Sequence, residues 1–247
     1  MDTENLIYGR NPVEEQFHHY PDRVVKLFIR ENLRGAKVDQ LLKAAKEHRI
    51  PVQRVPGKKL YEMVGKVNDQ GMVAQVSPVT FVELQDWLES IDLTTHPAVL
   101  ILDEIEDTHN FGAIIRSAAA SGIDGIIIGK HRQAPVNASV IKTAAGTAQH
   151  VPMIRVTNLN QSIIELKEAG FWIMGLDQNG DQSYWKADYN LPLGMVLGNE
   201  NKGIRQKTLE HCDFKIFIPM PGPTESLNVS VSSALLCYER LRQKSTG

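Results

Sequence analysis

Residues that could act on a ligand follow the apolar run Val99–Leu102, in a loop that leads into a helical pattern. Asn110 is expected as the N-cap of that helix, and Gly112 leaves room for a close backbone approach. Arg116 stands farther along the helix, among Ala, Ile and Ser residues. An arginine in such a helix either pairs with a nearby carboxylate or points into a pocket for an anion, and its position in the sequence leaves both open.

A second polar loop follows the apolar run that ends at Leu197. Gly198 and Gly203 enclose the polar residues Asn199 to Lys202, ahead of another helical pattern. Glycines around polar residues at a strand end indicate a tight turn, whose backbone N–H and C=O groups can grip a flat ligand. Many strand-to-helix turns share this composition, so the loop alone does not identify a ligand.

A third loop follows Ile218 and contains three prolines and a glycine within five residues, from Pro219 to Pro223. Because proline restricts the backbone, this loop is predicted to be a stiff, non-helical cradle. Ser226 is expected to cap the helix that follows, with Asn228 in its first turn. Simple helix capping and a role in a binding or catalytic site explain Ser226 and Asn228 equally well.

These loops belong to a regular alternation of strands and helices from Ala98 onward. Continuous Ile, Val and Leu runs indicate strands buried on both faces, so the pattern predicts an α/β fold with a mostly parallel sheet between helices. Ligands of such sheets bind at the carboxyl ends of strands, here after Leu102, Leu176, Leu197 and Ile218. The expected strands are 99–102, 125–128, 151–156, 171–176, 195–197 and 215–218, and the expected helices are 111–121, 140–149, 161–169, 204–211 and 227–243.

The first 78 residues form a separate, small α/β pattern. Its expected strands are 24–29, 51–55 and 72–76, and its expected helices are 38–48 and 58–66. Val38, Leu41, Leu42 and Ala45 make one apolar stripe along the first helix, whose opposite face is basic. That face is either an ordinary solvated surface or a modest contact surface for phosphates.

Residues 79–97 contain four acidic residues, no basic ones and a few large apolar side chains, and they end at Pro97. This composition predicts a short helical linker. We therefore expect a front domain of residues 1–78 and a larger domain of residues 98–247.

The charge of the chain is nearly balanced. Its 247 residues include 27 Lys and Arg against 29 Asp and Glu, which gives a net charge of −2. This balance excludes a disordered tail and a strongly basic arm that holds nucleic acid by charge alone. The front part is the slightly basic one, because residues 1–78 carry 13 basic and 10 acidic residues.

The sequence lacks the motifs that are typical of several kinds of site and segment. Cys212 and Cys237 lack the spacings of zinc sites and disulfide frameworks, so no metal is expected. The N-terminal residues show no signal peptide, and no apolar stretch reaches the roughly 18 residues of a membrane helix. There is no phosphate-loop or dinucleotide fingerprint. We expect a cytoplasmic protein that does not enter a membrane.

Together the three loops resemble the three motifs of the SpoU family of RNA ribose 2′-O-methyltransferases, within the SPOUT class. The motif N-x-G-x-x-x-R matches Asn110, Gly112 and Arg116, the motif L-G-N-E-x-x-G matches Leu197 to Gly203, and the motif I-P-M with S-L-N-V-S matches residues 218–220 and 226–230. The order and spacing of all three make the resemblance specific.

The resemblance extends along the whole chain. Residues 8–13 and 69–74 are similar to the start and end of the family's small, ribosomal-protein-like α/β RNA-binding domain. Residues 143–152 and 155–159 are similar to the subgroup that methylates a guanosine in 23S ribosomal RNA. The chain departs from the usual pattern at Thr108, where the family usually has proline, and within residues 146–149.

The resemblance implies a trefoil knot in the C-terminal domain, with the cofactor S-adenosyl-L-methionine bound against it. Main-chain groups at Leu176, Gly198, Ile218 and Leu227 would hold the adenine and ribose of the cofactor, with Thr147 close by. We expect Gly198 to be needed because a side chain there would block the approach of the ligand.

The implied reaction is in-line transfer of a methyl group to a ribose 2′-hydroxyl. Arg116 is implied to activate that hydroxyl. Because a guanidinium hardly ever gives up its proton, we expect it to act electrostatically, on the adjacent phosphate and the developing oxyanion. Asn110, Ser226 and Asn228 would orient the arginine and the ribose. Glu200 would pair with the arginine or position the substrate.

The family works as a homodimer in which each active site uses both chains. Apolar residues of the last helix, such as Leu235 and Tyr238, are compatible with an interface and equally with an ordinary core. Two alternatives stay open: methylation of transfer RNA rather than ribosomal RNA, and a non-catalytic RNA-binding protein of ribosome assembly with the same fold. Binding of S-adenosyl-L-methionine separates the second alternative from an enzyme.

Overall fold

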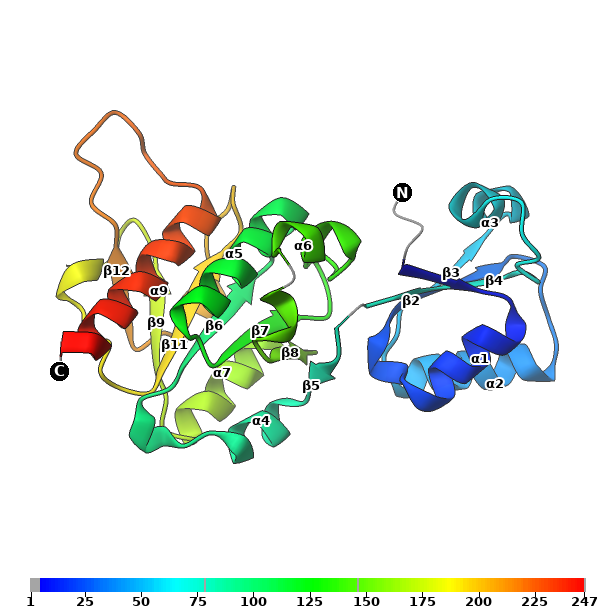
Figure 1. Cartoon of the computed structure of the whole chain (residues 1–247), viewed down its shortest axis with the longest axis horizontal. Coiled ribbons are helices and arrows are strands. Elements are labelled where there is room, and N and C mark those ends of the chain that lie inside the picture. Colours follow the sequence, from blue (N-terminus) through cyan, green and yellow to red (C-terminus); the bar gives the residue numbers. More distant parts are fainter. Residues whose placement is uncertain (1–4, 78, 146, 247) are drawn as a thin grey trace. The chain divides into compact units, whose positions relative to one another are not determined.

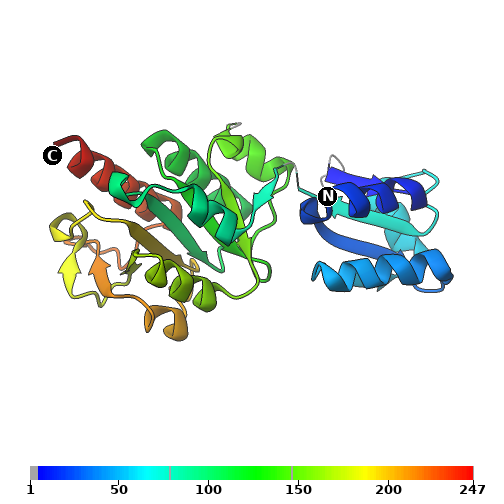
Figure 2. The same ribbon diagram turned by 90° about the horizontal axis from the view of Figure 1, so that it is seen from below.

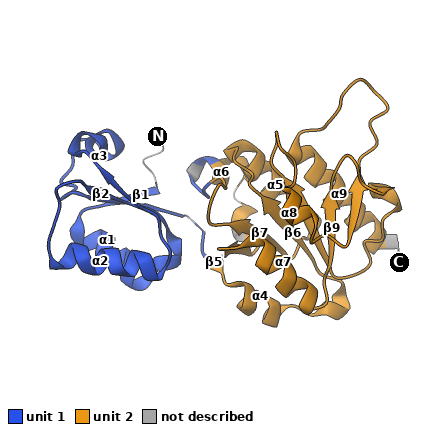
Figure 3. Ribbon diagram, turned by 180° about the vertical axis from the view of Figure 1, so that it is seen from behind, with its two compact units in different colours: residues 1–80, 135–139 blue, residues 81–134, 140–247 orange. Residues whose placement is uncertain are grey.

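The computed structural model describes residues 5–77, 79–145 and 147–246 and divides into two compact units. Unit 1 comprises residues 1–80 and 135–139, and unit 2 comprises residues 81–134 and 140–247 (Figure 3). Each unit has its own sheet and its own apolar core.

Unit 1 is built on a four-stranded sheet (Figure 1). Its elements are β1 (Leu6–Tyr8), α1 (Arg10–His19), η2 (Pro21–Arg23), β2 (Val24–Arg30), α2 (Ala36–Glu47), β3 (Val52–Val55), α3 (Gly57–Val64) and β4 (Met72–Val76). The strand order is β1-β4-β2-β3; β2 and β3 run parallel, while β4 runs antiparallel to both of its neighbours. The three strands and two helices expected for this part are present, and β1 and α1 are additions that the sequence did not predict.

The amphipathic pattern of α2 explains how it packs. Val38, Leu41 and Ala45 are buried in one apolar cluster with Leu27 and Ile29 of β2. The apolar stripe predicted for this helix therefore faces the sheet. A smaller apolar cluster joins α3 to β2, β3 and β4.

Unit 2 is built on an eight-stranded sheet. Its elements are β5 (Phe81–Val82), α4 (Leu84–Ser90), η3 (Leu93–Thr95), β6 (Ala98–Asp103), α5 (Thr108–Ser121), β7 (Gly125–Gly129), α6 (Ala138–Thr143), η4 (Thr147–Gln149), β8 (Met153–Val156), α7 (Leu159–Glu168), β9 (Trp172–Leu176), β10 (Gln182–Ser183), η5 (Tyr184–Lys186), β11 (Leu193–Gly198), α8 (Gln206–Leu209), β12 (Phe214–Phe217) and α9 (Val229–Thr246). The strand order is β10-β12-β9-β11-β6-β7-β8-β5, and each of these pairs is parallel. Helices α4, α7 and α8 share one apolar cluster with the sheet, while α5 and α9 pack side by side on the other face (Figure 2). The predicted α/β fold with a mostly parallel sheet is confirmed.

Most of the segment 79–97, expected to be a linker, belongs to unit 2. Strand β5 pairs with β8, and α4 buries Leu84 and Trp87 in the apolar core of that unit. The Trp87 indole Nε1–H also donates to the carbonyl oxygen of Asp124 at 3.0 Å. The acidic residues between these apolar ones are exposed. An amphipathic helix thus accounts for the composition, and the boundary between the units lies near Thr80.

Two expected helices are shorter in the structure. In place of a helix over 140–149, α6 ends before Ala145, whose φ of 51° is left-handed, and the turn η4 follows. Gly146 lies outside the described residues. In place of a helix over 204–211, α8 begins late, because Arg205 is extended and donates its backbone N–H to the Asp103 carboxylate at 2.9 Å.

The described residues contain neither a candidate membrane span nor a cluster of metal-ligating side chains. In residues 5–77, 79–145 and 147–246, no helix is long and apolar enough to cross a membrane. In the same ranges, His, Cys, Asp and Glu side chains do not gather in threes as metal ligands would.

The two cysteines are free thiols in protected surroundings. Burial raises the pKa of Cys212 to about 12 and that of Cys237 to about 11. We therefore expect iodoacetamide near pH 8 to label neither thiol in the folded protein and both after unfolding in guanidinium chloride, as counted by mass spectrometry. Because the unfolded thiols lose their protons first, the free energy of unfolding should also fall as the pH rises above about 9. Rapid labelling of the folded protein would contradict this burial.

Candidate active site

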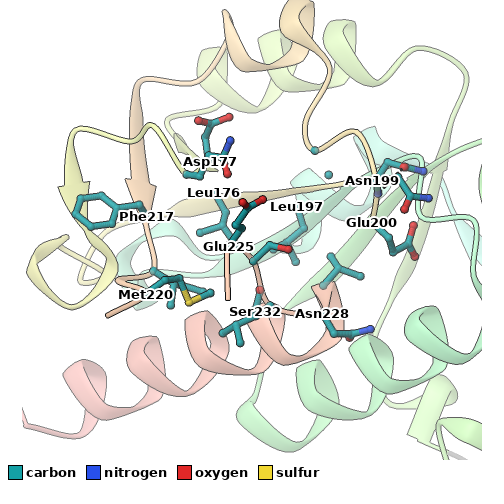
Figure 4. Close-up of a pocket in the computed structure, with 18 of the residues that line it drawn as sticks. Leu176, Asp177, Leu197, Asn199, Glu200, Phe217, Met220, Glu225, Asn228 and Ser232 are labelled. Carbon is teal, nitrogen blue, oxygen red and sulfur yellow. Dashed lines mark hydrogen bonds between the residues drawn. The ribbon is translucent and has the colours of Figure 1, made fainter. Parts of the chain in front are cut away.

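A pocket of about 1240 Å³ opens at the carboxyl ends of β9, β11 and β12 (Figure 4). Its walls come from Asn110 and Trp185, from residues 176–178, 197–203 and 217–221, and from positions between 225 and 232. This is the sheet edge at which parallel α/β folds bind ligands. The volume exceeds the roughly 300–1,000 Å³ of ordinary small-molecule sites, so the pocket has room for more than one reactant.

The turn from Gly198 to Gly203 forms one wall of the pocket. It is closed by two backbone hydrogen bonds between Asn199 and Gly203, at 3.0 and 2.9 Å. A Cβ atom on Gly198 would lie 2.1 Å from the backbone carbon of Gly203 and 2.1 Å from the nitrogen of Ile204. The expected reason for this glycine was access for a ligand. The structure gives a different reason, because backbone atoms of the chain itself occupy the space that a side chain would need.

Buried polar groups that the sequence analysis missed anchor this turn to the loop after β6. Asn199 Nδ2 donates to the carbonyl oxygen of Glu104 at 2.8 Å. Asp103 has no exposed surface, and its carboxylate accepts from the backbone N and the Nε of Arg205 at 2.9 and 2.7 Å. These bonds compensate the burial of the Asp103 charge. The signal available in the sequence was the position of Asp103, directly after a buried apolar run.

Asn110 joins three segments that are far apart in the sequence. Its Nδ2 donates to Glu200 Oε1 at 3.1 Å, and its Oδ1 accepts from Asn228 Nδ2 at 2.9 Å. Asn228 is held in turn, because its Oδ1 accepts from the backbone N of Ser230 at 2.9 Å. The structure therefore brings three of the five expected catalytic residues into one hydrogen-bonded chain at the pocket wall.

The helix caps differ from those expected. Asp107 caps α5, because its Oδ1 accepts from the backbone N of Asn110 at 2.7 Å. This leaves the side chain of Asn110 free to reach across to the other loops. Helix α9 begins at Val229 and is capped by Asn228, so Ser226 lies ahead of the helix.

The remaining expected residues divide into two groups. Ser226 and the cofactor candidates Leu176, Gly198, Ile218 and Leu227 line the pocket.

Arg116 and Thr147 do not line it. Arg116 is exposed on α5, and in the described part of the chain no hydrogen bond or ion pair holds its side chain. Thr147 lies in η4, where its Oγ1 donates to the Ala144 carbonyl oxygen at 2.7 Å.

Three charged side chains of the pocket, Asp177, Lys202 and Glu225, were not among the expected site residues. Asp177, Glu200 and Glu225 bring three carboxylates to its wall, and Lys202 brings one ammonium group. Asp177 directly follows a buried strand, which is a signal that sequence reasoning can use. Glu225 and Lys202 stand at positions where the motifs accept any residue.

Two known protein families together match nearly the whole chain. Residues 97–238 match the SpoU rRNA Methylase family, and residues 6–82 match the family described as RNA 2′-O ribose methyltransferase substrate binding. YacO of Bacillus subtilis (strain 168), which its name assigns to the TrmH family of tRNA/rRNA methyltransferases, is 39% identical over 241 residues, 97% of this chain and 96% of YacO. A Staphylococcus aureus (strain MSSA476) protein, assigned by name to the same family, is 38% identical over 246 residues, 98% of this chain and 97% of its own.

Solved structures show the same fold. The SpoU methyltransferase AviRb from Streptomyces viridochromogenes, in complex with the cofactor AdoMet, has a TM-score of 0.62 at 23% identity and covers 98% of this chain and 91% of its own. The TrmH/SpoU tRNA modifying enzyme of A. aeolicus has a TM-score of 0.57 at 30% identity, over 66% of this chain and 83% of its own. The predicted fold class, a knotted α/β SPOUT domain with a smaller α/β domain before it, is confirmed. The chain belongs to the SpoU family of S-adenosyl-L-methionine-dependent RNA methyltransferases.

Proposed function

We propose that this protein transfers a methyl group from S-adenosyl-L-methionine to the ribose 2′-hydroxyl of a guanosine in 23S ribosomal RNA. The observation that carries the proposal is the chain of hydrogen bonds from Asn228 through Asn110 to Glu200, at the wall of a pocket formed by strand ends. The choice of a guanosine in ribosomal RNA is supported by the similarity of residues 143–152 to that subgroup.

The pocket suits the cofactor chemically. Apolar side chains and main-chain groups at the strand ends make a slot for a flat adenine and its ribose, and they come from Leu176, Gly198, Ile218 and Leu227. The three carboxylates of the wall favour a ligand with a positive charge. When bound, the cofactor supplies a methyl group on a positively charged sulfur.

The hydrogen-bonded side chains would orient the ribose. Both polar atoms of the Asn110 amide are engaged, so this residue holds Glu200 and Asn228 at fixed positions. Glu200 Oε1 accepts from Asn110, which leaves Oε2 to accept a hydrogen bond from the ribose hydroxyl. Prior positioning of this kind removes much of the entropic cost of aligning a hydroxyl for attack.

We propose that Arg116 completes the site of a second copy of the chain in a homodimer. Its side chain is exposed and does not line the pocket of its own chain. Helix α9, which packs beside α5, exposes Val231, Tyr238 and Leu241 at 47%, 50% and 37%. An apolar stripe of this kind suits an interface between protein chains. Across it, the guanidinium would grip the phosphate beside the attacked hydroxyl and stabilise the developing oxyanion.

The test uses ribosomal and transfer RNA from a strain that lacks the gene. We expect the purified protein to transfer labelled methyl groups to ribosomal RNA and to make the bond after one guanosine resistant to alkaline hydrolysis. Methylation of transfer RNA alone would overturn the proposed substrate. If calorimetry detects no binding of S-adenosyl-L-methionine, a non-catalytic RNA-binding protein is the better account.

A further inference from the structure

We propose that Lys202, on the Gly198–Gly203 turn, and Arg132, which Glu104 links to that turn, bind backbone phosphates of the RNA close to the ribose that is methylated. The inference rests on the proposed function, and it assigns a substrate-binding role to two cations of unit 2 that no motif of the family names. Unit 1 has its own match to a substrate-binding family, so these contacts would act in addition to it.

A hydrogen bond fixes the backbone of Lys202, and its side chain is exposed. It lines the pocket on the same turn as Glu200, and its backbone N–H donates to Asn199 Oδ1 at 3.3 Å. Although three carboxylates share the pocket wall, its exposed ammonium group pairs with none of them and makes no side-chain hydrogen bond within the described part of the chain. A lysine ammonium group has three N–H donors, and all three are available to a ligand.

Arg132 is linked to the same turn through Glu104, and its guanidinium group is only partly paired. Its Nε lies 3.0 Å from Glu104 Oε1, and 66% of its side chain is exposed. The carbonyl oxygen of Glu104 accepts from Asn199, so Glu104 ties Arg132 to the turn. Arg205 shares the Glu104 carboxylate at 3.1 Å, but its other nitrogens are engaged by Asp103. Arg132 therefore keeps both terminal guanidinium nitrogens for an incoming anion, whereas each of the three side-chain nitrogens of Arg205 already faces a carboxylate.

The charge of the pocket explains why such cations are needed. Three carboxylates favour the positively charged methyl donor, but they repel RNA, which is a polyanion. An internal ribose in RNA has a phosphate on each side. A cation beside the Asn110–Glu200 pair therefore meets a phosphate whenever the ribose is in place. Contacts to phosphates position a nucleic acid without reading its sequence, which suits residues that the family's motifs do not specify.

The test compares Lys202→Ala, Arg132→Ala and the double variant. Binding and methylation of ribosomal RNA from a strain that lacks the gene are measured over a series of salt concentrations. Each single variant should raise the KM for this RNA roughly 10-fold and change kcat little. The slope of log affinity against log salt should become shallower by about 0.7 to 1 for each cation, and by twice that in the double variant. Calorimetry without RNA should show unchanged affinity for S-adenosyl-L-methionine.

Two controls separate this role from a loss of charge in general. Lys244→Ala removes the same charge from a side chain whose Nζ bonds to Thr95 at 3.1 Å, before the amino end of β6 and thus at the opposite edge of the sheet. It should leave the KM and the salt slope unchanged. Lys202→Arg keeps the charge and should retain the salt slope of the natural protein.

Unchanged KM and salt slope in both single variants would overturn the inference. So would a Lys202→Ala protein that binds RNA normally but loses affinity for the cofactor, because the lysine would then hold the cofactor's carboxylate. Absence of methyl transfer by the unaltered protein counts against the proposed function instead. The salt slope of RNA binding still tests the phosphate contacts in that case.

Discussion

Arg116→Ala should abolish methyl transfer while S-adenosyl-L-methionine still binds. In the proposed mechanism Arg116 stabilises the charge that develops on the attacking oxygen, and losing one such interaction commonly lowers the rate by about 100- to 1,000-fold. Because the proposed contacts of Arg116 are with the RNA phosphate and the attacking oxygen, and not with the cofactor, cofactor affinity should not change. Initial rates with labelled cofactor measure the first effect, and calorimetry measures the second. Turnover at the natural rate would refute the role of this arginine.

Mixing two inactive variants tests whether Arg116 acts across a dimer. A dimer of one Arg116→Ala chain and one Asn110→Ala chain has one complete site only if the arginine serves the neighbouring chain. Equal amounts of the two, unfolded and refolded together, should therefore recover about a quarter of the natural activity, since half of the dimers are mixed and each has one good site. No recovery would place Arg116 in the site of its own chain. Sedimentation of a stable, active monomer would refute the dimer itself.

The loops that make the pocket could be predicted because their positions follow from sheet topology. Parallel strands place their carboxyl ends at one edge, so the loops after Leu176, Leu197 and Ile218 had to meet. The same rule does not determine which side chains contact one another. That Asn110 accepts from Asn228 and donates to Glu200 depends on Asp107 taking over the cap of α5, a choice between two good capping residues that composition cannot decide.

Contacts between distant residues overrode several local patterns. The bond from Arg205 to Asp103 joins residues 102 positions apart and delays the start of α8, although the local sequence is compatible with an earlier start. The acidic run before Pro97 looks like a linker until Leu84 and Trp87 are seen to pack beneath the sheet. In both cases tertiary packing, which no short window of sequence contains, determined the outcome.

The net charge of −2 conceals the separation of charge that the site needs. A methyl donor with a positive charge and an RNA substrate with many negative ones make opposite demands on the same few residues. In the proposed binding mode the carboxylates of the pocket wall meet the first demand, and the exposed side chains of Lys202 and Arg132 meet the second. On this proposal a nearly neutral protein binds RNA through local cations, although its composition excludes binding by charge alone.

Gly198→Ala should remove cofactor binding and destabilise the protein, although it adds a single methyl group. The new Cβ atom would lie 2.1 Å from backbone atoms of Gly203 and Ile204, which cannot rotate away as a side chain can. The turn must open, which breaks the hydrogen bonds between Asn199 and Gly203 and moves Glu200 away from Asn110. We expect at least a 100-fold loss of cofactor affinity by calorimetry, and a free energy of unfolding lower by about 1–3 kcal/mol in urea.

Gly222→Ala is the matched control, because it adds the same methyl group to the third loop of the site. No atom lies within 4 Å of a Cβ on Gly222, and its backbone is not left-handed. Its free energy of unfolding should stay within about 0.5 kcal/mol of the natural value, with cofactor affinity unchanged. If Gly198→Ala behaved like this control, the turn would have to be pliable. A pliable turn would not hold Glu200 and Asn110 in fixed positions, and the proposed chemistry depends on those positions.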